Sequence, residues 1–178
     1  MLELPWFQML PDKDITNQIR PRGIPVHEYS QQMSGKDFIK LQDRVGLYEK
    51  KLGLEICDFL FEPTFMIGKN MISLFRSLAP DVETKTLTLF STNNKGQGIN
   101  YWIPYLPPVD CLKKDIDRCY VRPSALSGRN IAKYEGKREV RWLFSLTAAE
   151  QILSRGPIGI HFVKLPMISE VDSIENNA

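Results

Sequence analysis

The stretch from residue 138 to 166 constrains the fold more than any other part of this 178-residue chain. Thr147 and Glu150 have the spacing of a helix capping box, in which the threonine hydroxyl accepts a bond from the backbone N–H three residues later and the glutamate caps the helix in return. Gly156-Pro157 predicts where this helix ends. Apolar strands are expected on either side of it, at residues 141–144 and 158–165.

A similar order of elements occurs earlier in the chain, over residues 55–91. Residues 67–78 place apolar side chains at helical spacing and precede Pro80, which predicts a helix that ends near that proline. The strands expected around it are residues 54–61, 84–92 and 99–106, the last two forming a hairpin across the polar turn 93–98. The chain therefore predicts two strand–helix–strand units and a central hairpin.

The amino-terminal third has a different character. Prolines recur through residues 1–33, so an extended arm is expected there rather than a helix. Trp6 and Phe7 are too apolar for a free tail: either the arm covers part of the core, or these aromatic side chains bind a partner. Residues 34–52 carry apolar side chains at spacings of three and four, which predicts a longer helix capped by Ser34.

Together these patterns predict one α+β domain built on a mixed β-sheet. In this reading, residues 1–33 form an extended arm packed on the domain, residues 34–166 form the core, and residues 167–178 form a frayed acidic tail. The 43% of hydrophobic residues is sufficient for a buried core.

Composition restricts the function. The net charge of +2 argues against a dedicated nucleic-acid binder, which concentrates positive charge. The cysteine count of three does not suit a disulfide framework, and no cysteine or histidine spacing matches a metal site, so no metal or cofactor is expected. With no leader sequence and no apolar run of about 18 residues, we expect a cytoplasmic protein without membrane contact.

Candidate binding residues lie in the polar connector 109–122. Asp110, Asp115 and Asp117 do not have the spacing of a calcium loop. We therefore treat these three aspartates and Arg118, together with Trp6 and Phe7, as candidates for contact with a protein partner.

Two other functions stay open. Residues 118–141 are locally basic and include Tyr120 and Tyr134, a combination that can bind nucleic acid by ion pairing and stacking. A small enzyme would depend on His27 or His161, the histidines of the chain, as its acid or base near neutral pH. His161 alternates with apolar neighbours in a predicted strand, which points it to the opposite face from Ile160 and Phe162.

The order of elements over residues 54–166 resembles a bacterial family of immunity proteins from polymorphic and contact-dependent toxin systems. The resemblance is carried by the segments LEICDFLF, IGKNMISLFRSL and TLTLFSTNNKGQGINYWIPYL, and by the closing segment FSLTAAEQILSRGPIGIHF. It implies a small cytosolic protein that binds a cognate toxin domain and blocks it by direct contact. Whether the protein acts as a monomer or a homodimer stays open. Such a role implies no catalytic residues, so the resemblance favours a binding protein over an enzyme.

Overall fold

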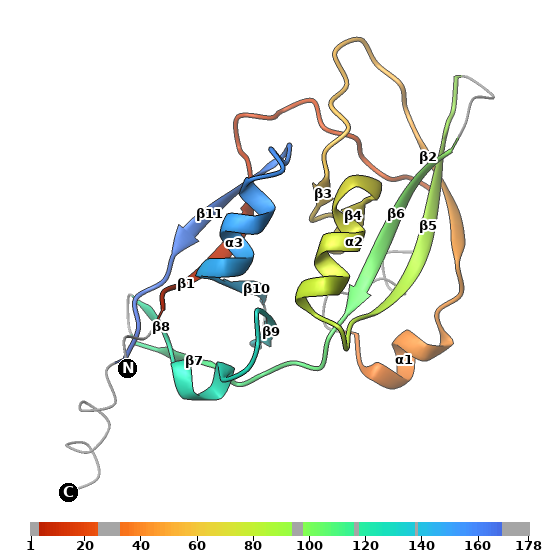
Figure 1. Cartoon of the computed structure of the whole chain (residues 1–178). Helices are drawn as coiled ribbons and strands as arrows, with labels where there is room; N and C mark the ends of the chain where they lie inside the picture. Colours follow the sequence, from red (N-terminus) through yellow and green to blue (C-terminus); the bar gives the residue numbers. More distant parts are fainter. Residues whose placement is uncertain (1–3, 25–32, 94–97, 116–117, 138, 169–178) are drawn as a thin grey trace, which may run out of the picture.

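A computed structural model of the chain describes residues 4–24, 33–93, 98–115, 118–137 and 139–168. Within these residues the strands form a four-stranded, a five-stranded and a two-stranded sheet (Figure 1). The helices are α1 (Gly35–Lys40), α2 (Lys69–Leu78), α3 (Leu146–Leu153) and the 3-10 helix η1 (Pro123–Leu126). The predicted α+β class is confirmed in broad terms. Strands predominate, however, and they lie in several sheets instead of one mixed sheet.

The four-stranded sheet, here called the C-terminal sheet, has the strand order β11-β1-β10-β9 with antiparallel neighbours throughout. Its strands are β1 (Trp6–Pro11), β9 (Ile131–Glu135), β10 (Val140–Ser145) and β11 (Ile160–Lys164). The chain passes from β10 through α3 to β11, and β1 fills the space between those two strands. Part of the expected arm is thus an inner strand of the sheet rather than a cover laid over it.

The five-stranded sheet, here called the central sheet, has the order β2-β5-β6-β4-β3, and only its β2–β5 pair is parallel. Its strands are β2 (Arg44–Tyr48), β3 (Phe59–Leu60), β4 (Met66–Gly68), β5 (Glu83–Ser91) and β6 (Ile99–Tyr105). Here β4, α2 and β5 follow one another while β6 lies between the two strands. The predicted strand–helix–strand echo is therefore real, and in both copies an antiparallel strand separates the two outer ones.

Two sequence predictions for this region were wrong in detail. The expected strand at residues 54–61 is reduced to Phe59–Leu60, and the strand that leads into α2 is Met66–Gly68 instead. The helix expected over residues 34–52 ends at Lys40, and Arg44–Tyr48 forms β2. Arg44–Tyr48 pairs with β5 instead of continuing the helix. Gly46 lets the two strands' neighbours pack closely, because an added Cβ there would lie only 2.9 Å from Leu89 Cδ2.

Helix caps follow the ordinary chemistry of hydroxyl side chains. Ser34 Oγ accepts a bond from the Asp37 N–H at 3.3 Å, as the sequence predicts. The cap of α3 is Ser145, whose Oγ accepts from the Ala148 N–H at 3.2 Å, so the helix begins earlier than the predicted Thr147 box. The residue before the helix is also the last of β10, so strand and helix join without a loop.

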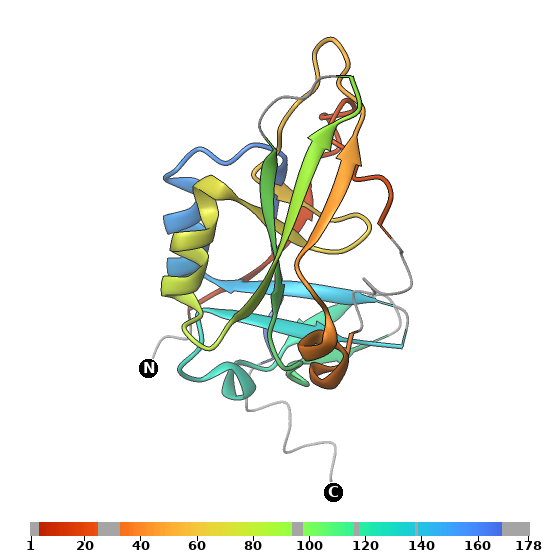
Figure 2. The same cartoon turned by 90° about the vertical axis from the view of Figure 1, so that its right-hand side faces the viewer.

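The largest hydrophobic cluster lies between the two large sheets and the helices. In Figure 2, α2 and α3 lie on one side, the strands of the central sheet stand nearly upright, and β9 and β10 cross them nearly horizontally. The helices contribute apolar faces to this cluster: Met71, Ile72, Leu74, Phe75 and Leu78 from α2, and Ala148, Ala149 and Ile152 from α3. The two units thus share one core.

Asp58 joins the two units through hydrogen bonds. Its carboxylate accepts from the backbone N–H of Ile158 at 3.0 Å and from Asn70 Nδ2 at 3.1 Å, and its own N–H donates to the Ile158 carbonyl at 3.1 Å. The side chain is nearly buried, at 8% exposure. Buried polar groups need such partners, so this aspartate fixes the loop before β11 against the start of α2.

Candidate functional site

A broad open groove of about 820 Å³ lies on the face of the C-terminal sheet that points away from α3. We call it the sheet groove. It is lined by residues from β1, β10 and β11 and from the two-stranded sheet of β7 (Leu112–Lys114) and β8 (Cys119–Val121). The lining residues are Gln8, Lys114, Asp115, Arg118, Cys119, Arg141, Val163, Lys164, Leu165 and Pro166.

The groove exists because β7 and β8 cover only part of this sheet face. Leu112 and Val121 pack in a small cluster with Trp6 and Leu143, which covers that part. The Val121 N–H donates to the Pro166 carbonyl at 2.8 Å and ties β8 to the chain after β11. Beside this covered part, the other side chains on the same sheet face stay uncovered, and several of them are polar.

A small charge network centred on Glu139 includes three residues that line the groove, Gln8, Lys114 and Arg141. Glu139 accepts hydrogen bonds from Arg141 Nε at 3.1 Å and Arg141 Nη2 at 2.9 Å, and it pairs with Lys114. Arg141 Nη1 also donates to Gln8 Oε1 at 3.1 Å. Partial burial pushes the pKa of Glu139 upward, but the bonds from Lys114 and Arg141 outweigh it and hold that pKa below its usual value.

The structure brings together two of the predicted partner-binding residues. Asp115 and Arg118 both line the groove, and the Asp115 N–H donates to the Arg118 carbonyl at 2.8 Å. Asp110 is exposed at a different place and pairs with Arg122, with 2.7 Å between Asp110 Oδ2 and Arg122 Nη2. Asp117 lies outside the described residues.

The structure places the two candidate aromatic side chains on opposite faces of β1. Trp6 is only 6% exposed and packs in the cluster under β7 and β8. Phe7 points to the opposite face and packs edge-on against Phe162, with ring centroids 6.5 Å apart. Trp6 is therefore a core residue, and Phe7 is a partly buried residue that packs against the core.

The basic stretch 118–141 is divided among different surroundings. Lys133 is 3% exposed and pairs with Glu135 at 2.5 Å, while Arg122 and Arg141 pair with carboxylates. His161 is exposed on β11 and points away from the core that holds its neighbours, as the alternation predicts. His27 lies outside the described residues.

Sequence reasoning missed Gln8, Arg141 and Lys164 as groove residues. Gln8 and Arg141 are polar residues between apolar neighbours in their strands, and this alternation was the available signal. Lys164 is different, because it pairs with Phe7 across β1 and β11, so alternation places it on the other face and it borders the groove near the end of β11. The strand order that places these three residues on adjacent strands is a property of the whole fold.

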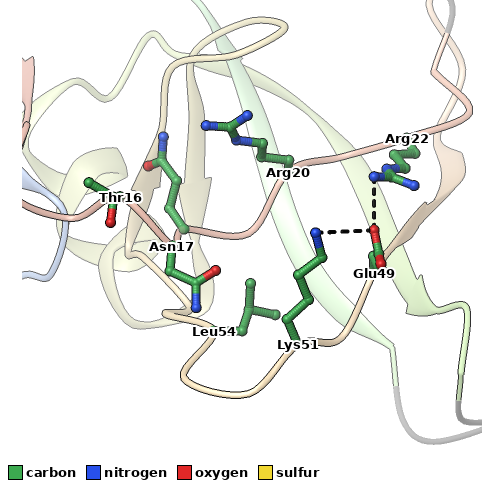
Figure 3. A pocket seen from close by; sticks show the side chains of 8 residues that line it. Thr16, Asn17, Arg20, Arg22, Glu49, Lys51 and Leu54 are labelled. Atoms are coloured by element: carbon green, nitrogen blue, oxygen red, sulfur yellow. Dashed lines mark ion pairs between the residues drawn. The ribbon is translucent and has the colours of Figure 1, made fainter.

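A second, smaller pocket of about 250 Å³ lies between residues 16–22 and 49–54. We call it the amino-terminal pocket. Figure 3 shows its lining, with Lys51 pointing toward Glu49 and Arg22 beside the same glutamate. The lining residues are Thr16, Asn17, Gln18, Arg20, Arg22, Glu49, Lys51 and Leu54. The two hollows share no residue.

Over the described parts of the chain, no group of three or more His, Cys, Asp or Glu residues is placed to hold a metal ion. The helices found in those parts are too short or too polar to cross a membrane. A scan against protein-family models and a search of curated proteins gave no match to this chain.

The thiols provide a pH-dependent prediction. Burial is the main cause that raises the pKa of Cys57 and of Cys111, each to about 11, whereas Cys119 is partly exposed. The thiolate is the reactive form, so at pH 8 iodoacetamide should label Cys119 in the folded protein and leave the other two unlabelled. Mass spectrometry of labelled peptides, with a urea-unfolded sample as the control, measures this. Equal labelling of all three in the folded protein would contradict it.

Raised thiol pKa values also link stability to pH. The pKa of a cysteine in an unfolded chain is about 8.5. In the folded protein Cys57 and Cys111 keep their protons up to a pH of about 11. Their contribution to the free energy of unfolding is therefore complete below the pKa of the unfolded state. It is lost as the pH rises through the pKa of the folded state.

Proposed function

We propose that this chain is a binding protein that neutralises a cognate bacterial toxin domain by direct protein–protein contact, without chemistry of its own. The observation that carries the proposal is the sheet groove, which gathers Lys114, Arg118, Arg141 and Lys164 on one open surface. The resemblance to immunity proteins supports the choice of a toxin as the partner.

The chemistry of the groove suits a protein surface. Four cations and one carboxylate, Asp115, line it, and Glu139 pairs with two of those cations, so positive charge stays in excess by two. Val163 is 40% exposed beside them. Arginine combined with apolar side chains is typical of protein interfaces, and an acidic partner surface would complement the charge.

The groove is also built to keep its shape. Arg141 is held by Glu139 and Gln8, so its guanidinium is fixed before any partner arrives. Preorganised side chains lose less conformational entropy when they bind, which favours affinity. Arg118 and Lys164 are exposed and supply charge that steers an acidic partner toward the surface.

Reversing charge in the groove tests the proposal. The double variant Arg118→Glu and Lys164→Glu should weaken binding of the toxin domain encoded by the neighbouring gene by about tenfold or more, chiefly by slowing association. Growth rescue on co-expression, co-purification and surface plasmon resonance at two salt concentrations measure the effect.

The matched control is Lys113→Glu. Lys113 is exposed on β7 next to Lys114 but does not line the groove, so this variant should protect cells as the wild type does. Full protection by the double variant would remove the groove from the interaction. Neither rescue nor co-purification by the wild type would overturn the proposed function itself.

A further inference from the structure

The amino-terminal pocket has the features of an anion site, and it does not depend on the proposed function. Three of its lining residues are cations, Arg20, Arg22 and Lys51, and one is an acid, Glu49. The lining therefore carries two more positive than negative charges. We propose that this pocket binds the phosphate groups of a small molecule, such as a diphosphate.

The backbone around the pocket is fixed at both ends. On one side the Ile19 N–H donates to the Glu55 carbonyl at 3.0 Å, and the Glu55 N–H donates to the Asn17 carbonyl at 2.9 Å. On the other side Arg22 and Leu47 exchange two backbone bonds, of 2.7 and 3.0 Å. Between these two bridges the loop 49–54 bends away, and this separation creates the pocket.

The loop itself is pinned. Asn17 Nδ2 donates to the Leu52 carbonyl at 3.1 Å, and the Leu54 N–H donates to the Lys51 carbonyl at 3.2 Å. Gly53 completes the turn with a φ of +72°, which favours glycine. The pocket is therefore a formed feature of the fold, and ligand binding does not have to order its walls.

Alternation along residues 18–22 directs the charged groups. Ile19 is 1% exposed and packs into the core beneath the central sheet, so its neighbours Gln18 and Arg20 point outward. In Figure 3 the Arg20 side chain extends outward from the backbone, and its guanidinium points away from Lys51 and Glu49. Among the described residues, no carboxylate forms an ion pair with Arg20, which leaves its donors for a ligand.

Glu49 positions the other two cations. Its Oε2 atom lies 2.9 Å from Arg22 Nη2 and 3.5 Å from Lys51 Nζ. One carboxylate neutralises only one of the two, and each cation keeps further N–H donors. Arginine binds phosphate oxygens through two parallel bonds, and lysine adds a point charge, so this set matches a phosphate better than it matches a single carboxylate.

Size limits the ligand. A volume of about 250 Å³ is below the range of about 300–1,000 Å³ in which drug-sized ligands are enclosed. The pocket therefore holds a charged group such as a diphosphate, and any attached nucleoside or sugar would extend beyond it.

Isothermal titration calorimetry with pyrophosphate, inorganic phosphate and ADP, at constant ionic strength, tests the proposal. Saturable binding of pyrophosphate is expected, and Arg20→Gln should weaken it at least about tenfold, as the loss of a charged hydrogen bond does. Lys51→Gln should weaken it in the same direction. Arg129→Gln, which removes an exposed arginine away from the pocket, should leave binding unchanged.

The three ligands separate the sources of the phosphate group. Equal affinity for ADP and pyrophosphate would identify the diphosphate alone as the ligand, and tighter binding of ADP would add contacts to the nucleoside outside the pocket. Absence of saturable binding, or equal binding by wild type and Arg20→Gln, would overturn the proposal. Circular dichroism melting of each variant shows whether the fold is intact. Arg20→Gln should melt like the wild type, because Arg20 forms no ion pair among the described residues.

Discussion

Replacing Gly159 with alanine is expected to lower the free energy of unfolding by about 2–5 kcal/mol. Two costs add at this position. The backbone has a φ of +94°, which residues with a Cβ rarely adopt. In addition, the new Cβ would lie 2.7 Å from both Cβ and Sγ of Cys57, far inside van der Waals contact.

The surroundings of Gly159 leave little room for relief. Its carbonyl accepts a bond from the Asp12 N–H at 3.0 Å, and the preceding residue, Ile158, exchanges bonds with Asp58. Cys57 is 1% exposed, and its own carbonyl accepts from the buried Tyr101 hydroxyl at 2.8 Å. Both sides of the clash are therefore fixed by hydrogen bonds, so the strain cannot be removed by a small local shift.

Gly156→Ala is the matched control, because it lies in the same loop. Gly156 has a φ of +62° but no atom within 4 Å of an added Cβ, so this variant incurs backbone strain alone, about 1 kcal/mol. Urea unfolding followed by circular dichroism compares the two. Equal losses in both variants would show that the contact with Cys57 carries no cost.

Local sequence patterns predicted the repeated units, because helical spacing and the residues that end a helix depend only on neighbouring positions in the chain. The same reasoning failed at residues 44–48, because Val45 and Tyr48 are three residues apart and would share one face of a helix, whereas a strand places them on opposite faces. In the structure Gly46 and Tyr48 are buried while Val45 and Leu47 are exposed, which is the alternation of a strand. Pairing with β5 decides between the two, and that pairing joins segments about 40 residues apart.

In the candidate site, too, the sequence predicted what neighbouring residues determine and missed what the strand order determines. Asp115 and Arg118 are close in sequence and were both selected, and they do meet at the groove. Trp6 was selected for its apolar character, which here reflects burial in β1. Gln8 and Arg141 lie more than a hundred residues apart, and only the insertion of β1 beside β10 brings them together. A strand order of this kind has no local sequence signal.

Aromatic packing around Phe65 also joins the two units. This side chain is 2% exposed and contacts four other rings. Three of these rings belong to the same unit: Phe59, Phe61 and Phe75. The fourth, Trp142 on β10, stacks on Phe65 with centroids 4.6 Å apart and belongs to the other unit.

Phe65→Ala should therefore lower the free energy of unfolding by about 3–5 kcal/mol, because it removes a large buried side chain and leaves a cavity between two sheets that hydrogen bonds hold in place. Phe65→Leu keeps most of the apolar burial and should cost less, about 1–2 kcal/mol. Phe90→Ala, at a phenylalanine that is 37% exposed, is the control and should cost about 1 kcal/mol. Urea unfolding followed separately by tryptophan fluorescence and by circular dichroism measures all three. If the Phe65→Ala transitions coincide, the units unfold together as one core requires, and a small loss with two separate transitions would mean that each unit is stable without the other.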